Sequence, residues 1–200
     1  MTQAEITQRN NAVIAGLDKD TAFKARQFIS NLWLLGIDIL LLSGYRTLPE
    51  QWELRKKYLL HNGGLAAKPG YSWHNFRRAF DFIEVIDGNI DWTMKNLQHF
   101  ITAIRNVGLK AGADFSDYDH AQNSIGQNLA DYQKGIADIE KYKSLEYDLL
   151  NGVNKPNTPE EIHAQGQKDN KQLYTVLFGS ALILSTIFIM SNKQKTYSYA

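Results

Sequence analysis

Apolar and polar positions alternate with two different periods along the first part of the chain. Apolar residues recur at mostly helical spacing over residues 22–35 and 94–107, and a glycine follows each run. Residues 37–42 and 79–86 are shorter and rich in branched or aromatic side chains, which is typical of buried strands. A proline at position 49 begins a further helical segment that extends to about residue 60. Together these segments predict an α+β fold, a small and largely antiparallel sheet backed by helices.

The intervening segments are more polar and their periodicity is weaker. Residues 1 to about 20 are polar, and Asp18-Lys19-Asp20-Thr21 offers side-chain oxygens that suit the N-cap of the following helix. Residues 110–115 predict a short strand. Residues 123–147 carry a sparse apolar stripe at helical spacing and predict a helix that either wraps the domain or forms a stalk. We therefore expect one domain over residues 1–150 with its core at about 20–125.

The C-terminal part of the chain has a different composition. Residues 151–172 combine glycine, two prolines and many polar side chains, which predicts a flexible linker. Residues 173–190 form an uncharged, largely apolar run that at about 1.5 Å per residue just spans a bilayer. This run predicts a single-pass transmembrane helix and membrane localisation, followed by a short polar tail at 191–200; a buried core helix is the alternative. Lysines flank both ends equally, so the orientation stays open.

Composition excludes several classes of protein. The chain has 200 residues, 44% of them hydrophobic, which suffices for one globular domain and an appendage. Its formal net charge of +1 argues against nucleic acid as a partner, because no basic stripe is present to neutralise phosphates. The absence of cysteine rules out disulfides and thiolate metal ligands, so histidine and carboxylate must hold any metal. The first thirty residues lack a continuous apolar core, so we expect no secretory signal peptide.

Two short clusters offer the side chains of a zinc site. His74 and Asp81 lie seven residues apart in an aromatic setting, and Asp117-Tyr118-Asp119-His120 supplies a second imidazole further on. Two neutral imidazoles and one carboxylate form a common catalytic zinc set, since the fourth tetrahedral position stays free for water. Positions seven apart on a regular strand point to opposite faces, so the chain must bend between His74 and Asp81. We therefore place His74 on a loop and Asp81 near the start of the strand.

The segment that contains His74 also has the form of a known signature. Ser72-x-His74-x4-Ala79-x-Asp81 resembles the Ser-x-His-x-x-Gly-x-Ala-x-Asp signature of the VanX/VanY-like zinc peptidases. This family includes D-alanyl-D-alanine carboxypeptidases and the L-alanyl-D-glutamate endopeptidases that serve as phage endolysins. Its fold is the LAS, or hedgehog-like, zinc peptidase fold.

Two further motifs agree with the resemblance. The segment 43–47, Ser-Gly-Tyr-Arg-Thr, followed by Gln51, resembles the family's Ser-Gly-Tyr-Arg-Thr…Gln segment. Asp117-x-x-His120 resembles its Asp-x-x-His, in which the acid is catalytic and the histidine is a metal ligand. Three separated motifs in the right order cover roughly residues 20–125.

The resemblance implies a zinc enzyme that cleaves an amide bond next to a D-amino acid in peptidoglycan stem peptides. It would be a D-Ala-D-Ala carboxypeptidase or an L-Ala-D-Glu endopeptidase; the alternative is an inactive cell-wall-binding or phage structural module that keeps the fold. Asp117 would take the water proton and return it to the leaving amine. Arg46 would act with Asp117 at the reacting carbonyl, by orienting the substrate or stabilising the oxyanion. The resemblance also implies that zinc is bound by His74, Asp81 and His120. Substrate would be bound by Gln51, Ser72 and Ser43.

One position departs from the signature, and several residues are set aside. Arg77 stands where the family has glycine, a residue usually needed where the backbone takes a positive φ, so a long side chain there could strain the loop or crowd the metal. Trp92 is expected to be a core anchor in preference to a substrate-side wall. His61 and His99 are expected to be exposed, and His163 is discounted because it lies in the linker.

Overall fold

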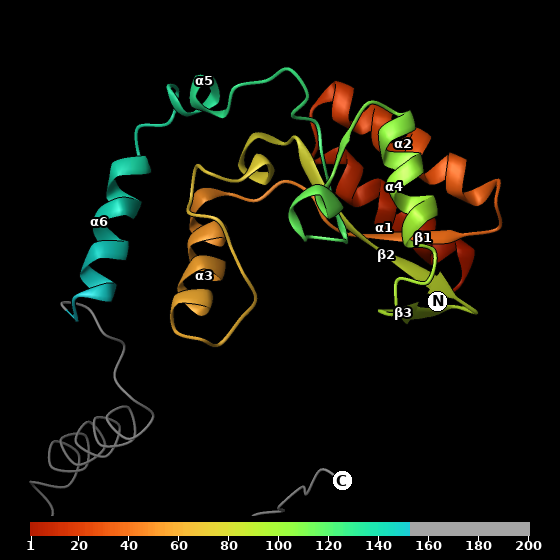
Figure 1. Cartoon of the computed structure of the whole chain (residues 1–200), viewed down its shortest axis with the longest axis horizontal. Coiled ribbons are helices and arrows are strands. Elements are labelled where there is room, and N and C mark those ends of the chain that lie inside the picture. Colours follow the sequence, from red (N-terminus) through yellow and green to blue (C-terminus); the bar gives the residue numbers. More distant parts are fainter. Residues whose placement is uncertain (153–200) are drawn as a thin grey trace, which may run out of the picture. The chain divides into compact units, whose positions relative to one another are not determined.

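The computed structural model describes residues 1–152, which form one compact unit (Figure 1). Helices occur at both ends of this part, with the strands between them. The helices are α1 (Gln3–Ala15), α2 (Lys19–Trp33), α3 (Leu48–Leu59), α4 (Leu97–Asn106), α5 (Leu129–Gln133) and α6 (Ile139–Leu150), with the 3₁₀ turns η1 (Trp73–Phe76) and η2 (Gly112–Phe115). The strands are β1 (Asp38–Ser43), β2 (Ala79–Ile86), β3 (Asn89–Asp91), β4 (Lys110–Ala111) and β5 (His120–Gln122).

The strands form one antiparallel sheet in the order β1-β2-β5-β4, with β3 paired to the far end of β2. The longest strand, β2, therefore lies in the middle and carries most of the pairing. Its bounds coincide with the strand predicted over residues 79–86. For the residues that the structure describes, the predicted α+β class with a small antiparallel sheet is confirmed.

A cluster of aromatic side chains joins α2 and α4 to one face of the sheet. The rings of Phe28 and Phe82 lie 5.0 Å apart, and those of Phe82 and Phe100 lie 5.6 Å apart, both nearly perpendicular. Phe80 belongs to the same buried cluster. Because side chains alternate along a strand, Asp81 points to the opposite face of the sheet, away from these helices.

Helix α1 lies along the outer edge of β1, a contact that the sequence did not predict. It begins with a capping box between Thr2 and Glu5. Its buried Asn10 accepts a hydrogen bond from Leu41 N at 2.7 Å and donates one to Ile39 O at 2.8 Å. The buried face of the helix thus carries the polar Asn10 between two apolar residues. This interrupts the apolar periodicity by which a helix is predicted from sequence.

The segment after α4 differs from its predicted elements. The strand expected over 110–115 covers only Lys110–Ala111 and gives way to η2, because the chain turns sharply at Gly112: a Cβ there would lie 1.9 Å from Asp117 O. The single helix expected over 123–147 is replaced by a loop and the two helices α5 and α6, and the loop contains Gly126 at φ +68°.

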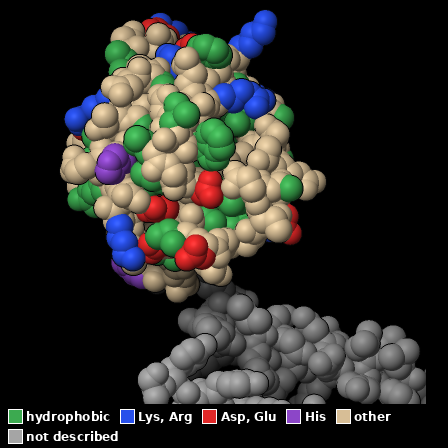
Figure 2. Space-filling view, turned by 90° about the vertical axis from the view of Figure 1, so that its right-hand side faces the viewer, with side chains coloured by type: hydrophobic (Ala, Val, Ile, Leu, Met, Phe, Trp, Pro, Cys, Tyr) green, Lys and Arg blue, Asp and Glu red, His purple; other side chains and the backbone are tan. Residues whose placement is uncertain are grey.

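The predictions for single side chains had mixed outcomes. Trp92 is 66% exposed, so the expected core anchor is wrong; it directly follows the short strand β3 and lies on the surface. His61 and His99 are exposed, as expected. On the face shown in Figure 2, basic and acidic side chains are interspersed with hydrophobic ones, which agrees with the near-zero net charge.

The predicted membrane localisation requires correction. Within the part of the chain that the structure describes, no helix is both long enough and apolar enough to cross a bilayer. The run 173–190, the tail 191–200, His163 and all but the first residues of the segment 151–172 lie outside the described residues. The predicted boundary at residue 150 stays a prediction.

Candidate metal centre

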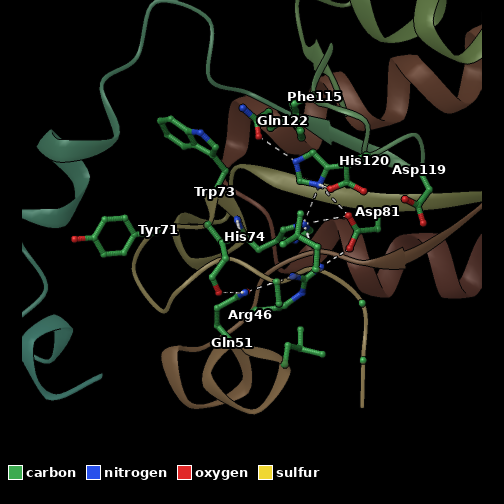
Figure 3. A pocket seen from close by; sticks show the side chains of 18 of the residues that line it. Arg46, Gln51, Tyr71, Trp73, His74, Asp81, Phe115, Asp119, His120 and Gln122 are labelled. Carbon is green, nitrogen blue, oxygen red and sulfur yellow. Dashed lines mark hydrogen bonds and ion pairs between the residues drawn. The ribbon is translucent and has the colours of Figure 1, made fainter. Parts of the chain in front are cut away.

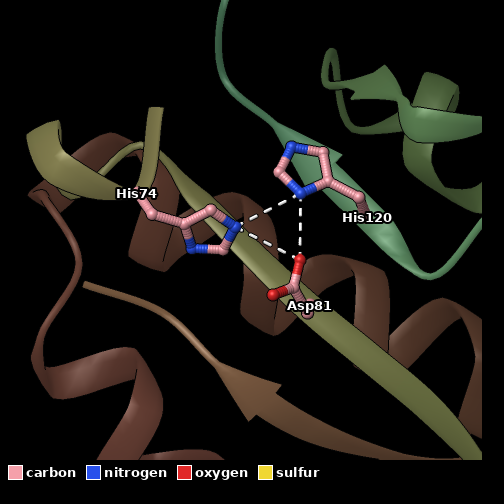
Figure 4. Close-up of side chains that lie close together, drawn as sticks. All are labelled: His74, Asp81 and His120. Atoms are coloured by element: carbon pink, nitrogen blue, oxygen red, sulfur yellow. Dashed lines mark hydrogen bonds and ion pairs between the residues drawn. The ribbon is translucent and has the colours of Figure 1, made fainter. Parts of the chain in front are cut away.

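Three side chains predicted as metal ligands converge on one point (Figure 4). Asp81 Oδ1 lies 2.9 Å from His120 Nδ1 and 3.2 Å from His74 Nε2, and the two imidazole nitrogens are 3.2 Å apart. Both histidines are buried, with 2% and 6% of their surfaces exposed. The structure thus brings together donors that are 46 residues apart in the sequence.

The spacing of these atoms suits a tetrahedral zinc ion. Nitrogen and oxygen ligands at 2.0–2.1 Å from zinc lie about 3.3 Å from one another in a regular tetrahedron. The three separations are close to this value, so small side-chain movements would admit the ion. The donor set has no sulfur and leaves one coordination position open, as a catalytic site requires.

The outer nitrogen of each imidazole has its own hydrogen-bond partner. His74 Nδ1 lies 2.6 Å from Gly44 O, and a carbonyl oxygen only accepts, so this nitrogen carries the proton. His120 Nε2 lies 3.1 Å from Gln122 Oε1 and donates to it in the same way. In the neutral rings, His74 Nε2 and His120 Nδ1 are therefore left with free lone pairs directed at the metal position.

Local backbone structure explains how the ligands meet. His74 lies on η1, whose first turn is capped by Ser72 Oγ at 3.4 Å from His74 N. The chain then reverses at Arg77, which has φ 63°, and enters β2. Asp81 and His120 are direct partners in the pairing of β2 with β5 and so share one face. The predicted bend between His74 and Asp81 is confirmed.

The second carboxylate oxygen of Asp81 is held by the segment after β1. Ser43 Oγ donates to Asp81 Oδ2 at 2.6 Å, and Arg46 Nη2 forms an ion pair with the same oxygen. A bulge at Leu42 sets Ser43 opposite Asp81, because the pairing moves from Leu41–Phe82 directly to Ser43–Asp81. Asp81 is thus oriented with only Oδ1 facing the imidazoles.

Arg46 is itself fixed by further hydrogen bonds. Its Nη2 donates to Ser43 Oγ at 2.9 Å and lies 3.2 Å from His74 Nε2, so the guanidinium borders the space between the three donors. Its Nη1 donates to Gln51 Oε1 at 3.3 Å. Gln51 is 1% exposed and donates from Nε2 to Ala67 O at 2.9 Å, which ties the arginine to the loop over residues 63–67.

Charge and burial act against each other at the donor atoms. Burial opposes ionisation of Asp81, but hydrogen bonds and charge from His120 and His74 hold the pKa of this carboxyl well below its usual range. Burial alone would lower the pKa of His120, yet its hydrogen bond to Asp81 and the charge of Asp81 raise it. The ionised carboxylate is therefore the stable form at this centre.

The metal centre opens into a cavity of about 420 Å³ (Figure 3). Its walls come from α3, the loop over residues 63–67, η1 and the segment around η2, and they include Tyr71, Trp73 and Phe115. The predicted site residues Arg46, Gln51 and Ser72 line it as well. Ser43 does not line the cavity and lies behind Asp81.

Two acidic side chains stand at the rim of this cavity. Asp117 Oδ2 lies 3.9 Å from His120 Nδ1, and its side chain is 53% exposed, so it reaches the centre from the solvent side. Asp119, which the sequence did not single out for a role, is half-buried; burial and the charge of Asp81 raise the pKa of its carboxyl. Asp117 is therefore the more accessible carboxylate, beside the metal donors but outside their triangle.

Gln122 was missed from the sequence, although a signal for it existed. Residues two apart on a strand share a face, so the second residue after His120 was a candidate partner once 120–122 was taken as a strand. Its Nε2 donates to Ser124 Oγ at 2.7 Å, which directs Oε1 to His120. The partner of His74 is a backbone carbonyl, Gly44 O, and no side chain identifies such a contact in advance.

Replacing Gln122 with leucine should weaken zinc binding about 10- to 100-fold, because His120 loses the acceptor that fixes its ring and tautomer. Gln122→Glu is the matched control, since its carboxylate can accept the same hydrogen bond. Competition with a chromophoric chelator on the full-length protein measures both affinities. Equal affinities for the leucine and glutamate variants would show that this hydrogen bond does not support the metal.

Arg77 occupies the left-handed conformation for which the family uses glycine. Its φ and ψ are 63° and 23°, and its side chain points away from the cavity. Nη1 donates to Gly16 O at 2.8 Å, and the guanidinium lies 4.0 Å from the ring centroid of Tyr45. The backbone of Arg77 also accepts a hydrogen bond from Asp18 N at 3.0 Å. The side chain therefore does not crowd the metal position, contrary to the concern raised by the sequence.

Arg77→Gly should retain hydrolytic activity and change the free energy of unfolding by no more than about 1 kcal/mol. Glycine relieves the left-handed strain, worth about 1–2 kcal/mol. Against this it removes an exposed hydrogen bond and a cation–π contact, worth about 0.5 kcal/mol each, and adds chain entropy of about 0.5–1 kcal/mol, so the terms nearly cancel. Arg77→Ala is the control, since it loses the contacts and keeps the strain, and should be less stable than the glycine variant. Denaturant unfolding and turnover assays compare the three proteins, and a large activity loss in the glycine variant would contradict this view.

Comparison with known proteins gives one significant relative by sequence. The peptidoglycan L-alanyl-D-glutamate endopeptidase CwlK of Bacillus subtilis (strain 168) is 30% identical over 102 aligned residues. The alignment covers 44% of this chain and 61% of the relative, so the chain spans about three fifths of that protein's length. No protein-family profile matches the chain.

Three solved structures have a partly similar fold. The L-Ala D-Glu endopeptidase ChiX of Serratia marcescens has 16% identity and a TM-score of 0.46, over 62% of this chain and 90% of its own. The LD-carboxypeptidase LdcB has 20% identity and a TM-score of 0.44, over 63% of this chain and 75% of its own. VanYB, solved with D-alanine-D-alanine, has 17% identity and a TM-score of 0.43, over 60% of this chain and 83% of its own. The sequence match to CwlK, together with the three motifs, confirms that this chain resembles the VanX/VanY-like zinc peptidases.

Proposed function

We propose that this protein is a zinc-dependent peptidase that hydrolyses the amide bond before a D-amino acid in peptidoglycan stem peptides, as an L-alanyl-D-glutamate endopeptidase. The observation that carries the proposal is the convergence of His74, Asp81 and His120 with their free donor atoms about 3 Å apart. The preference for the L-alanyl-D-glutamate bond rests on the activity of the relative from Bacillus subtilis.

Zinc would be held by His74 Nε2, Asp81 Oδ1 and His120 Nδ1, and when bound it would polarise the scissile carbonyl and lower the pKa of the attacking water. The protein keeps the three donors in place through a second set of contacts. Gly44 O and Gln122 Oε1 orient the rings, and Ser43 and Arg46 orient the carboxylate. The donors are thus arranged before the ion binds.

Asp117 would move the proton in this reaction. Its carboxylate lies beside His120 on the open side of the cavity, where it can accept a proton from the attacking water. The carbon–oxygen bond forms first and moves negative charge to the carbonyl oxygen. The carbon–nitrogen bond breaks when this charge returns to the carbonyl, and Asp117 gives the proton to the nitrogen of the leaving amine. A partly exposed carboxylate suits both steps because it can rotate between the two positions.

Arg46 would stabilise negative charge on the carbonyl oxygen of the substrate. It borders the donor triangle, and Ser43, Gln51 and Asp81 hold its guanidinium in place, so its charge is already oriented when substrate arrives. Ser72 caps η1 and lines the cavity, so it can both position His74 and contact the peptide. Gln51 and Ser43 act through Arg46 and Asp81.

Digestion of purified peptidoglycan by the full-length protein, followed by mass analysis of the muropeptides, tests this function. We expect zinc-dependent release of peptides that begin with D-glutamate, abolished by a chelator and restored by added zinc. Loss of a single terminal alanine would indicate a carboxypeptidase instead. If the protein binds zinc stoichiometrically and still releases nothing, the chain is the inactive wall-binding module.

A further inference from the structure

A second cavity, of about 770 Å³, adjoins the metal cavity. The two share the lining stretch 64–67 together with Tyr71, Phe115 and Asp117, so they form one continuous depression. Its outer wall includes Lys143 on α6, which follows the motif-bearing region of residues 20–125. A peptide held at the metal centre therefore has room to extend toward α6.

The two cavities differ in charge. The metal cavity is lined by the three carboxylates Asp81, Asp117 and Asp119 and by the two cations Arg46 and Lys57, of which Arg46 is paired with Asp81. The second cavity is lined by three cationic side chains, Arg55, Lys68 and Lys143, and among its lining residues in the described part of the chain Asp117 alone is acidic. The depression is thus acidic at the metal and basic toward α6.

Only part of this positive charge is neutralised within the protein. Glu146 on α6 pairs with Arg55 at 2.8 Å and with Lys68 at 3.3 Å, and its side chain is only 7% exposed. One buried carboxylate thus faces two cations and joins α6 to α3. Arg55 is further held by Ala66 O at 2.9 Å, so it belongs to the frame of the cavity.

Lys143 is a solvent-exposed cation whose ion pair a ligand can replace. Its side chain is 46% exposed, and its partner Glu140, three residues earlier on the helix, is 79% exposed. An ion pair this open to solvent is worth little, so a carboxylate bound in the cavity can compete for the ammonium group. Lys68, with a side chain 49% exposed, stands on the same cavity.

We infer that the cavity between α3 and α6 is a subsite for a carboxylate of the substrate peptide, with Lys143 and Lys68 as its contacts. This inference rests on the proposed peptidase function and adds the direction in which the bound peptide runs through the two cavities. An acidic residue of the peptide would lie on the α6 side of the scissile bond, since the opposite arrangement would set it beside Asp117 and Asp119. Helix α6 is then part of the substrate site.

A matched pair of peptides tests the subsite on the full-length zinc-loaded protein. One stem-type peptide carries the free α-carboxylate of its D-glutamate, and the other carries the carboxamide at that position. We expect the acid to have a KM roughly two- to fivefold lower than the amide, as a half-exposed charge pair gives. Lys143→Glu should abolish or reverse this preference through KM and not through kcat.

Lys141→Glu is the control, because it makes the same charge change on the exposed side of the same helix and does not line the cavity. It should keep the wild-type preference; an equal loss in both variants, or equal KM values for the two peptides with wild type, would overturn the subsite. If wild type cleaves neither peptide, the proposed function fails, and calorimetric titration of the same two peptides still decides the subsite by their dissociation constants.

Discussion

His120→Ala should yield a protein without stoichiometric zinc and without measurable turnover. His74 and Asp81 alone would remain, and two protein ligands rarely retain zinc. The side chain of His120 also packs 2.9 Å from Asp81 Oδ1, so its removal opens space beside the remaining carboxylate donor. Metal analysis of the purified full-length variant, together with turnover, measures both effects.

His99→Ala is the control for this experiment. It removes an imidazole that is exposed on α4 and lies outside the cavity, so zinc content and turnover should match wild type. Circular dichroism of both variants checks that each has folded. Retention of one zinc per chain by His120→Ala would mean that the ion is bound elsewhere.

Asp117→Ala should have the opposite profile, with most of the zinc retained and the rate lowered about 10²- to 10⁴-fold, the usual contribution of a positioned acid/base group. The carboxylate lies 3.9 Å from His120 Nδ1 but outside the group of three donors, so its removal leaves the ligand set intact. Backbone hydrogen bonds from Asp117 N to Gly112 O and from His120 N to Asp117 O keep the turn in place without the side chain.

Asp114→Ala is the control for this variant, because it also removes an aspartate carboxylate from the segment around η2. Asp114 lies on η2, pairs with Arg105 at 2.7 Å and does not line the cavity, so its loss should leave turnover unchanged. Were Asp117→Ala as metal-free as His120→Ala, the assigned roles of acid/base and ligand would be wrong. If neither variant altered turnover, the peptidase proposal itself would fail.

The sequence predicted the central part of the site because its constraints are local. Residues 79–86 combine branched and aromatic side chains, and they form β2 with Asp81 near its start. The odd spacing of His74 and Asp81 required a bend, which the structure places at Arg77. The three motifs then identified His120 as the distant residue that completes the set of metal donors. Periodicity alone does not contain this information.

Other parts depended on tertiary contacts that leave a weak trace in the sequence. The chain forms β5 at His120–Gln122 because pairing with β2 outweighs local preference there, and the apolar stripe after residue 123, which suited one long helix, is divided between α5 and α6. Gln122 was overlooked for the same reason, since its role appears only once the strand is known. Helix α1 was missed because its buried face includes the polar Asn10.

The position of Asn10 has a consequence for the behaviour of the sheet in solution. β1 is an outer strand, and such a strand offers unpaired backbone groups to which another chain can add. The side-chain amide of Asn10 occupies Ile39 O and Leu41 N from outside, as a neighbouring strand would, and α1 covers the rest of that edge. The first helix thus shields the domain from strand-to-strand aggregation at the edge nearest the loop that carries Arg46.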